Sequence, residues 1–170
     1  MTTIPAKKWI GIKVALIAIG CAILPNRLAA DDKSQLQGVW RFQSEVDTRA
    51  DGSVATIGPA AGYSGLLVYT SDGYVSVNIM PKDRKWKGDS ASESQLRETI
   101  ETGTAYFGRY EVDPKEHTVT HIVEVGLEPS DEGRRLVRKY ELQDDTLVLS
   151  AIWQFHGQSL DFAVTWKRVK

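Results

Sequence analysis

The chain has 170 residues, of which 42% are hydrophobic and 25% are charged, a composition typical of one globular domain with a core. The only ionised side chains in the first 30 residues are Lys7, Lys8, Lys13 and Arg27, so the remainder holds 17 basic and 22 acidic residues, a net charge of −5. An acidic body lacks the clustered lysines and arginines that neutralise phosphates, which excludes nucleic acid as the expected partner.

The first 30 residues have the pattern of a secretory signal peptide. A basic start precedes an apolar run from Val14 to Leu24, and the small pair Ala29-Ala30 follows. The run has about 11 residues, too few to cross a bilayer of roughly 30 Å as a helix. We therefore expect export with cleavage near Ala30, a periplasmic or secreted location, and no stable membrane span in the mature protein.

Cys21, the only cysteine, leaves an alternative open. It follows Ala18-Ile19-Gly20, which loosely matches a bacterial lipoprotein cleavage box, so a lipid anchor through Cys21 is the second prediction for location. The three residues after Cys21 are also apolar, where a lipoprotein usually turns polar. If Cys21 leaves with the signal peptide, the mature domain has neither a thiol nor a disulfide, and burial alone holds it together.

The mature part, residues 31–170, is predicted to be one all-β domain, because short β-rich segments alternate with turn signals from Gln37 onward. The predicted strands lie near residues 38–46, 64–70, 74–80, 105–113, 118–128, 134–142, 146–153 and 160–168, with a further short strand around 53–57. Eight or nine antiparallel strands joined by short hairpins remove their edges by closing into an up-and-down barrel. A barrel of this size can hold one small ligand.

Residues 81–104 interrupt the strand pattern with a polar insertion that is basic at its start. Residues 90–93 (SASE) fit a capping box, and Leu96 and Ile100 share one face, which predicts a short helix over 91–103. We expect this loop and helix to lie across one mouth of the barrel like a lid.

Strand alternation predicts which side chains point into the barrel. On the first strand the inward set is Trp40, Phe42, Ser44 and Val46. On the last two strands the inward sets are Leu147, Leu149, Ala151 and Trp153, and Leu160, Phe162, Val164 and Trp166.

Two strands place a polar side chain on their apolar face. His121 shares its face with Val119, Val123, Val125 and Leu127. Arg138 shares its face with Leu136, Tyr140 and Leu142. A buried charge is costly unless paired, and a buried imidazole needs partners for both nitrogens. Each residue therefore indicates either an internal polar network, with a carboxylate paired to Arg138, or a bound ligand.

Two sets of segments resemble known families. Residues 38–41 (GVWR) resemble the G-x-W signature that opens lipocalins, and residues 165–168 (TWKR) resemble their closing strand. That resemblance implies that Trp40 lies at the closed base of the barrel and that Arg168 packs across its ring, a cation–π contact. The ordered segments 65–76, 108–113, 118–121 and 145–149 resemble the small lipocalin-like domain family of bacteria and fungi.

This second resemblance covers roughly residues 36–169 and implies mostly fold, with binding of small hydrophobic molecules as the usual expectation. The sequence contains no nucleophile elbow, phosphate loop, dinucleotide fingerprint or paired-cysteine metal motif. Its three histidines, His117, His121 and His156, do not form a recognisable ligand set, and we expect neither a metal nor a cofactor.

We therefore predict an exported lipocalin-like protein that binds a small hydrophobic ligand, which we allow to carry an anionic end, in the barrel cavity. The predicted binding residues are Trp40, Phe42, Tyr110, His121, Arg138, Tyr140, Trp153 and Phe162. One alternative is a cofactor-free isomerase, cyclase or hydrolase that uses His121 and Arg138 as catalytic residues in the same cavity. Another is a structural protein whose barrel is filled by its own side chains.

Overall fold

A computed structural model describes residues 32–85, 90–155 and 158–170. The expected signal peptide over residues 1–30, with Cys21, lies outside these described residues, as does His156. Among the helices of the described ranges, none is long and apolar enough to span a membrane.

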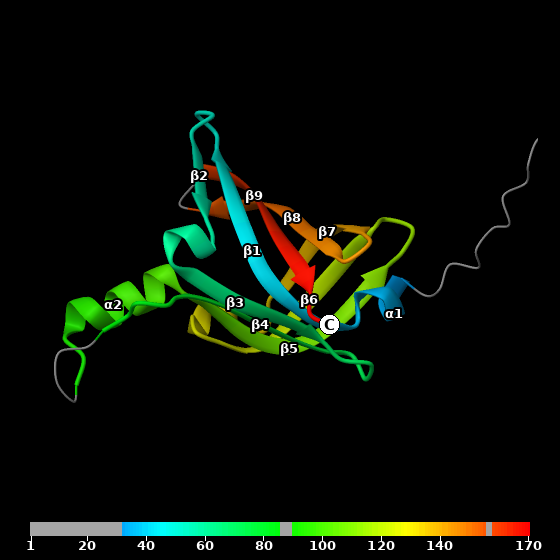
Figure 1. Ribbon diagram of the computed structural model, residues 1–170, viewed down its shortest axis with the longest axis horizontal. Helices are drawn as coiled ribbons and strands as arrows, with labels where there is room; N and C mark the ends of the chain where they lie inside the picture. Colours follow the sequence, from blue (N-terminus) through cyan, green and yellow to red (C-terminus); the bar gives the residue numbers. More distant parts are fainter. Residues whose placement is uncertain (1–31, 86–89, 156–157) are drawn as a thin grey trace, which may run out of the picture.

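The architecture is a closed barrel of eight antiparallel strands with one extra strand, which confirms the predicted fold class (Figure 1). The strands are β1 (Gly38–Arg49), β2 (Val54–Ile57), β3 (Tyr63–Tyr69), β4 (Tyr74–Pro81), β5 (Thr104–Asp113), β6 (Thr118–Gly126), β7 (Arg135–Gln143), β8 (Thr146–Phe155) and β9 (Gln158–Arg168). The sheet order is β2-β1-β3-β4-β5-β6-β7-β8-β9, and pairing of β1 with β9 closes the barrel. Two short 3-10 helices, η1 (Pro59–Ala61) and η2 (Pro129–Asp131), lie in the connections before β3 and before β7.

The core follows the predicted alternation on β8 and β9. Leu147 and Leu149 on β8 and Val164 and Trp166 on β9 are buried, and each faces a partner in the paired register. Because successive side chains of a strand point to opposite faces, the polar residues between them lie outside. These two strands form one continuous apolar wall of the interior.

On β1 the predicted inward face is correct only for the first half of the strand. Trp40 and Phe42 are buried, but the register of β1 against β9 shifts between Phe42 and Ser44, which leaves Gln43 as the extra residue of a β-bulge. Beyond it, Glu45 pairs with the inward Val164 and Asp47 pairs with Phe162. The expectation that Ser44 and Val46 point inward is therefore wrong, and the two carboxylates take their place.

A second bulge changes the end of β6. The register of β5 against β6 shifts so that Glu124 has no partner, and Val125 pairs with the exposed Phe107. Val125 was expected to share the face of His121, but it is turned out to solvent. The partner strand requires a glycine here, because a Cβ on Gly108 would lie 2.0 Å from the carbonyl oxygen of Ile122.

One end of the barrel is closed by α1 (Asp32–Leu36), a short helix that precedes β1 (Figure 1). Leu36 is fully buried, and its carbonyl accepts a hydrogen bond of 2.8 Å from the indole Nε1 of Trp40. The guanidinium of Arg168 donates to the carbonyls of Gln35 and Gln37. These contacts fix the helix against the base of the barrel.

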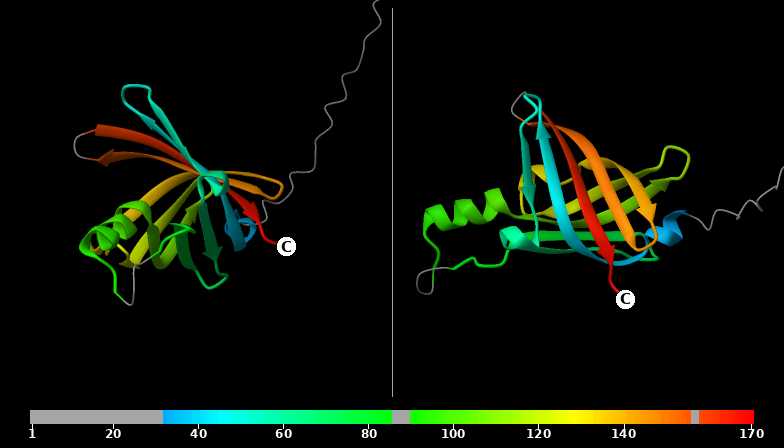
Figure 2. Two further views of the ribbon diagram at one scale, coloured as in Figure 1. Left: turned by 60° about the vertical axis from the view of Figure 1, so that its left-hand side comes forward. Right: turned by 45° about the horizontal axis from the view of Figure 1, so that its top comes forward.

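The predicted helix is present as α2 (Glu93–Thr102), but its cap and its orientation differ from the expectation. The N-cap is Ser92, whose capping box uses Gln95 instead of Glu93. Figures 1 and 2 show α2 extending away from the barrel instead of across its mouth. Leu96 and Ile100, which share one face of the helix, remain exposed, so this face does not cover the opening.

Candidate ligand-binding cavity

The barrel encloses a cavity of about 230 Å³ between the packed base and the open end. Its apolar wall consists of Val77, Ile79, Leu149, Trp153, Leu160, Phe162, Val164 and Trp166. Its polar groups are Glu45, Asp47, Thr104, Tyr106, His121 and Arg138. A wider pocket of about 520 Å³ adjoins it and shares Tyr106, Arg138, Trp153 and Phe162, so the cavity continues to the rim of the barrel beside the end of α2. The barrel is therefore not filled by its own side chains.

His121 is fully buried, and both of its ring nitrogens are occupied. Nε2 lies 2.6 Å from the hydroxyl of Tyr69, and Nδ1 lies 2.7 Å from the hydroxyl of Tyr106. Burial lowers the pKa of His121 well below its usual value, and the positive charge of Arg138 lowers it further. The imidazole is consequently neutral, with one nitrogen as donor and the other as acceptor. This network favours a structural role for His121 over the proton-transfer role of the enzyme alternative.

Arg138 is half-buried at the junction of the cavity and the wider pocket. Its Nη1 donates to the carbonyl of Leu136, and its guanidinium carbon lies 5.9 Å from the ring centroid of Tyr106 and 6.0 Å from that of Phe162. These distances are at the outer limit of a cation–π contact. Arg138 thus brings a positive charge to an aromatic part of the wall.

The carboxyl groups of Glu45 and Asp47 balance this charge. Desolvation by burial raises the pKa of Glu45 to about 7, the neighbouring Asp47 raises it too, and Arg138 acts in the opposite direction. Burial also raises the pKa of Asp47. Glu45 therefore changes its charge within the physiological pH range, beside Arg138.

Sequence reasoning missed Glu45 and Asp47 as members of the site. It offered a carboxylate partner for Arg138 as one of two possibilities, beside a bound ligand, but regular alternation placed both carboxylates outside the barrel. The bulge at Gln43 reverses their direction. The side-chain amide of Gln43 donates to the carbonyls of Arg41 and Phe42, and these bonds hold the distorted backbone.

Two polar atoms in the cavity wall are buried and lack a hydrogen-bond partner among the described residues. They are Oδ1 of Asp47, an acceptor, and Nε1 of Trp166, a donor. The side chain of Trp166 is only 2% exposed. Buried polar groups are nearly always paired in native structures, so these two atoms are exceptions to that rule.

The eight predicted binding residues separate into two groups. His121, Arg138, Trp153 and Phe162 line the cavity. Trp40, Phe42, Tyr110 and Tyr140 are buried nearer the closed end, outside the lining of the cavity. The hydroxyl of Tyr110 donates to the carbonyl of Thr70, and that of Tyr140 donates to the carboxylate of Asp32. This second group stabilises the base.

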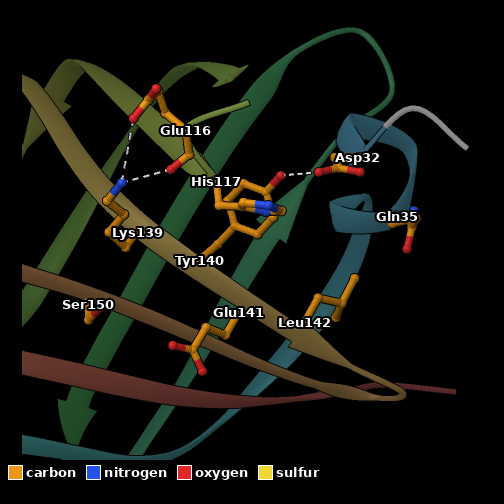
Figure 3. Close-up of a pocket in the computed structure, with 9 residues that line it drawn as sticks. All are labelled: Asp32, Gln35, Glu116, His117, Lys139, Tyr140, Glu141, Leu142 and Ser150. Carbon is orange, nitrogen blue, oxygen red and sulfur yellow. Dashed lines mark hydrogen bonds and ion pairs between the residues drawn. The ribbon is translucent and has the colours of Figure 1, made fainter. Parts of the chain in front are cut away.

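A more open hollow of about 710 Å³ lies on the outer surface near α1 (Figure 3). Figure 3 shows two bonded pairs among its lining residues: Lys139 with Glu116, and Tyr140 with Asp32. The ring of His117 packs edge-on against that of Tyr140. Because these groups already satisfy one another, we take the interior cavity as the candidate site. Within the described ranges, no group of three or more His, Cys, Asp or Glu residues is placed to hold a metal ion.

A closed eight-stranded barrel with a capped base and an interior cavity is a fold suited to small-ligand binding. The model of the lipocalin-like domain family matches residues 37–169, and the chain belongs to this family. A search of curated proteins finds no match.

Proposed function

We propose that this protein binds one small, largely apolar molecule in the barrel cavity. The observation that carries the proposal is the cavity itself, in which apolar side chains form most of the wall and polar groups from β1, β5, β6 and β7 form the rest. Trp153, Leu160 and Phe162 cover the apolar part of the ligand near the mouth, and Arg138 lies beside its polar part. The sequence interpretation allowed an anionic ligand end. Such an end, bound at Arg138, would share the cavity with the carboxyl groups of Glu45 and Asp47.

Blocking the mouth tests whether the cavity is the binding site. Thr104 is exposed and borders both the cavity and the wider pocket, so Thr104→Trp places a large side chain at the entrance. Thr48→Trp is the matched control, because Thr48 is exposed on β1 and is not part of either lining. The probe is N-phenyl-1-naphthylamine, whose fluorescence rises in apolar surroundings.

We expect Thr104→Trp to weaken probe binding by about tenfold or more and Thr48→Trp to leave the affinity unchanged. Native mass spectrometry of the purified protein gives an independent readout, since a co-purified small molecule should be lost in the Thr104→Trp variant alone. Equal probe affinity in the wild type and both variants would show that the cavity is not the site.

We also propose that the protein is exported, with cleavage near Ala30 and a periplasmic or secreted location. The support is the sequence pattern of the first 30 residues. Amino-terminal sequencing of the mature protein should begin at Asp31. A mature amino terminus at a lipid-modified Cys21 would instead establish the lipoprotein alternative.

A further inference from the structure

The strands β7 and β8 separate toward the open end of the barrel. Residues 139–143 of β7 pair with residues 146–150 of β8, and the ladder ends there. Residues 135–138 continue to pair with β6 and residues 151–155 with β9, but in the described chain no register pair joins these two stretches to each other. Figure 2 shows the end of the β8–β9 hairpin lying apart from the start of β7. Backbone pairing therefore closes the wall over only part of this boundary.

The wider pocket of about 520 Å³ lies in this separation as well as at the rim. Its lining includes three residues of β7 and three of β8, namely Leu136, Val137, Arg138, Ala151, Ile152 and Trp153. We call the space between these six residues the side opening. Arg138 and Trp153 also line the inner cavity, so the side opening is continuous with it.

The side opening offers an apolar path from the inner cavity to the surface. Five of its six side chains are apolar, and Val137 and Ile152 at its outer edge are 55% and 70% exposed. The nearest cation at this edge, Arg134, is paired with Asp131 at 2.6 Å and lies 5.5 Å from the ring centroid of Trp153. An exposed apolar passage that leads into an apolar cavity suits a hydrocarbon chain that lies in both.

The inner cavity alone is small for a ligand site. Its volume of about 230 Å³ is below the roughly 300–1,000 Å³ typical of small-molecule pockets. A ligand of ordinary size therefore has to extend into adjoining space, and between β7 and β8 that space has apolar walls.

We propose that the ligand is an elongated molecule with an unbranched aliphatic chain, whose polar end lies beside Arg138 and whose chain extends through the side opening between β7 and β8. This inference rests on the proposed function and specifies the class of ligand. It favours long chains over compact ring systems, because only a chain can occupy both the inner cavity and the side opening.

A series of alcohols tests the role of chain length, because 1-hexanol, 1-octanol, 1-decanol and 1-dodecanol differ in nothing else. Each is measured by displacement of N-phenyl-1-naphthylamine, with correction for the affinity of each variant for the dye. For the wild-type protein we expect the affinity to rise about two- to fourfold for each added methylene group throughout the series.

Ala151→Trp fills the side opening without entering the lining of the inner cavity. Ala151 is on the same face of β8 as the buried Leu149, so its side chain points inward. This variant should bind 1-hexanol within about twofold of wild type and 1-dodecanol about tenfold or more weakly. Asp161→Trp is the matched control, because Asp161 is exposed on β9 opposite Ile152 and belongs to neither lining. It should keep the full rise of affinity with chain length.

Ala151→Cys gives a second measurement if Ala151→Trp does not fold. Labelling by iodoacetamide is followed at position 151 by peptide mass spectrometry. At about ten times its dissociation constant, 1-dodecanol should slow this labelling about tenfold, because only unbound protein reacts. At the same relative concentration, 1-hexanol should leave the rate unchanged.

The inference is overturned if Ala151→Trp keeps the full rise of affinity with chain length, or if both alcohols have the same effect on labelling at position 151. It is also overturned if the dye binds the wild type but affinity does not increase from 1-hexanol to 1-dodecanol. If neither the dye nor any alcohol binds the wild type, the proposed function fails instead.

Discussion

The guanidinium carbon of Arg168 lies 4.0 Å from the ring centroid of Trp40, which joins the last strand of the barrel to the first. Gly38, two residues before Trp40, has a φ of 121°, and a Cβ there would lie 3.2 Å from Nη1 of Arg168. The glycine therefore allows both the backbone conformation and the close approach of the arginine. The G-x-W pattern of β1 thus has a direct physical explanation in this contact.

Because Trp40 is fully buried and holds α1 through its indole, Trp40→Ala should lower the free energy of unfolding by about 3–5 kcal/mol. Arg168→Ala should lose the same cation–π contact together with its bonds to Gln35 and Gln37. A double-mutant cycle in urea should give a coupling energy of about 1–2 kcal/mol. Strictly additive losses would contradict the contact.

Glu45 makes stability depend on pH in a defined direction. Its pKa is about 7 in the folded protein and 4.5 in the unfolded chain, so the folded state binds more protons between these values. Ionisation of Glu45 therefore lowers the free energy of unfolding as pH rises from about 4.5 to 7. Above about pH 7 the side chain is ionised in both states, and this loss of stability no longer increases. Glu45→Gln should be more stable than the wild type by about 2 kcal/mol at pH 8, after allowance for partial exposure.

Urea denaturation at pH 5, 6, 7 and 8 tests this dependence, because the difference between variant and wild type cancels the titration of His121, which is present in both. Glu141→Gln, at an exposed glutamate of β7, is the control. A difference between Glu45→Gln and wild type that does not grow with pH would show that Glu45 is not held in the cavity wall as described.

The His121 network predicts a cost for each hydroxyl that serves it. Tyr69→Phe and Tyr106→Phe each leave one nitrogen of a fully buried imidazole without its partner. Each change should lower the free energy of unfolding by about 1–3 kcal/mol. Tyr74→Phe, on an exposed ring, should change it by less than about 0.5 kcal/mol. Equal stability of all three variants would argue against the network.

The helix α2 should be the least protected regular element of the described chain. It extends away from the barrel and contains no buried residue, so local opening exposes little apolar surface (Figure 2). Hydrogen exchange should show its amides exchanging about 100-fold faster than those of the central strands β4 and β5. Protection equal to that of these strands would contradict the exposed position of α2.

Alternation and turn signals were sufficient to predict the strands and the closed barrel, because both are local patterns. The base, with Arg168 packed across Trp40, was implied by the resemblance to lipocalins. Alternation was not sufficient at Gln43 and Glu124, where a bulge adds one residue to a strand and turns the following side chains over. No residue type marks these bulges in one sequence. The orientation of α2 depends on tertiary packing, which its local capping pattern does not specify.

The sequence contained only indirect evidence of acidic side chains in the cavity, namely the position of Arg138 on an apolar strand face. A lone arginine on an apolar face indicates either an acidic neighbour or a ligand, but it does not identify which acid lies near it. Four predicted binding residues were correctly assigned to the interior, but their depth along the barrel axis was not predicted. These residues, Trp40, Phe42, Tyr110 and Tyr140, lie nearer the closed end. Depth depends on the shear of the closed barrel, and alternation along one strand contains no information about it.

The extra residue in β1 has an evolutionary consequence. Removing Gln43 would leave Phe42 opposite Trp166 and Ser44 opposite Thr165 in a regular ladder, so Glu45 and Asp47 would still face the lumen. A single-codon deletion at this position would thus shorten β1 without changing the charge of the interior. Relatives whose first strand is one residue shorter here can therefore keep the same inward carboxylates without a bulge, so the length of this strand alone does not predict the polarity of the cavity.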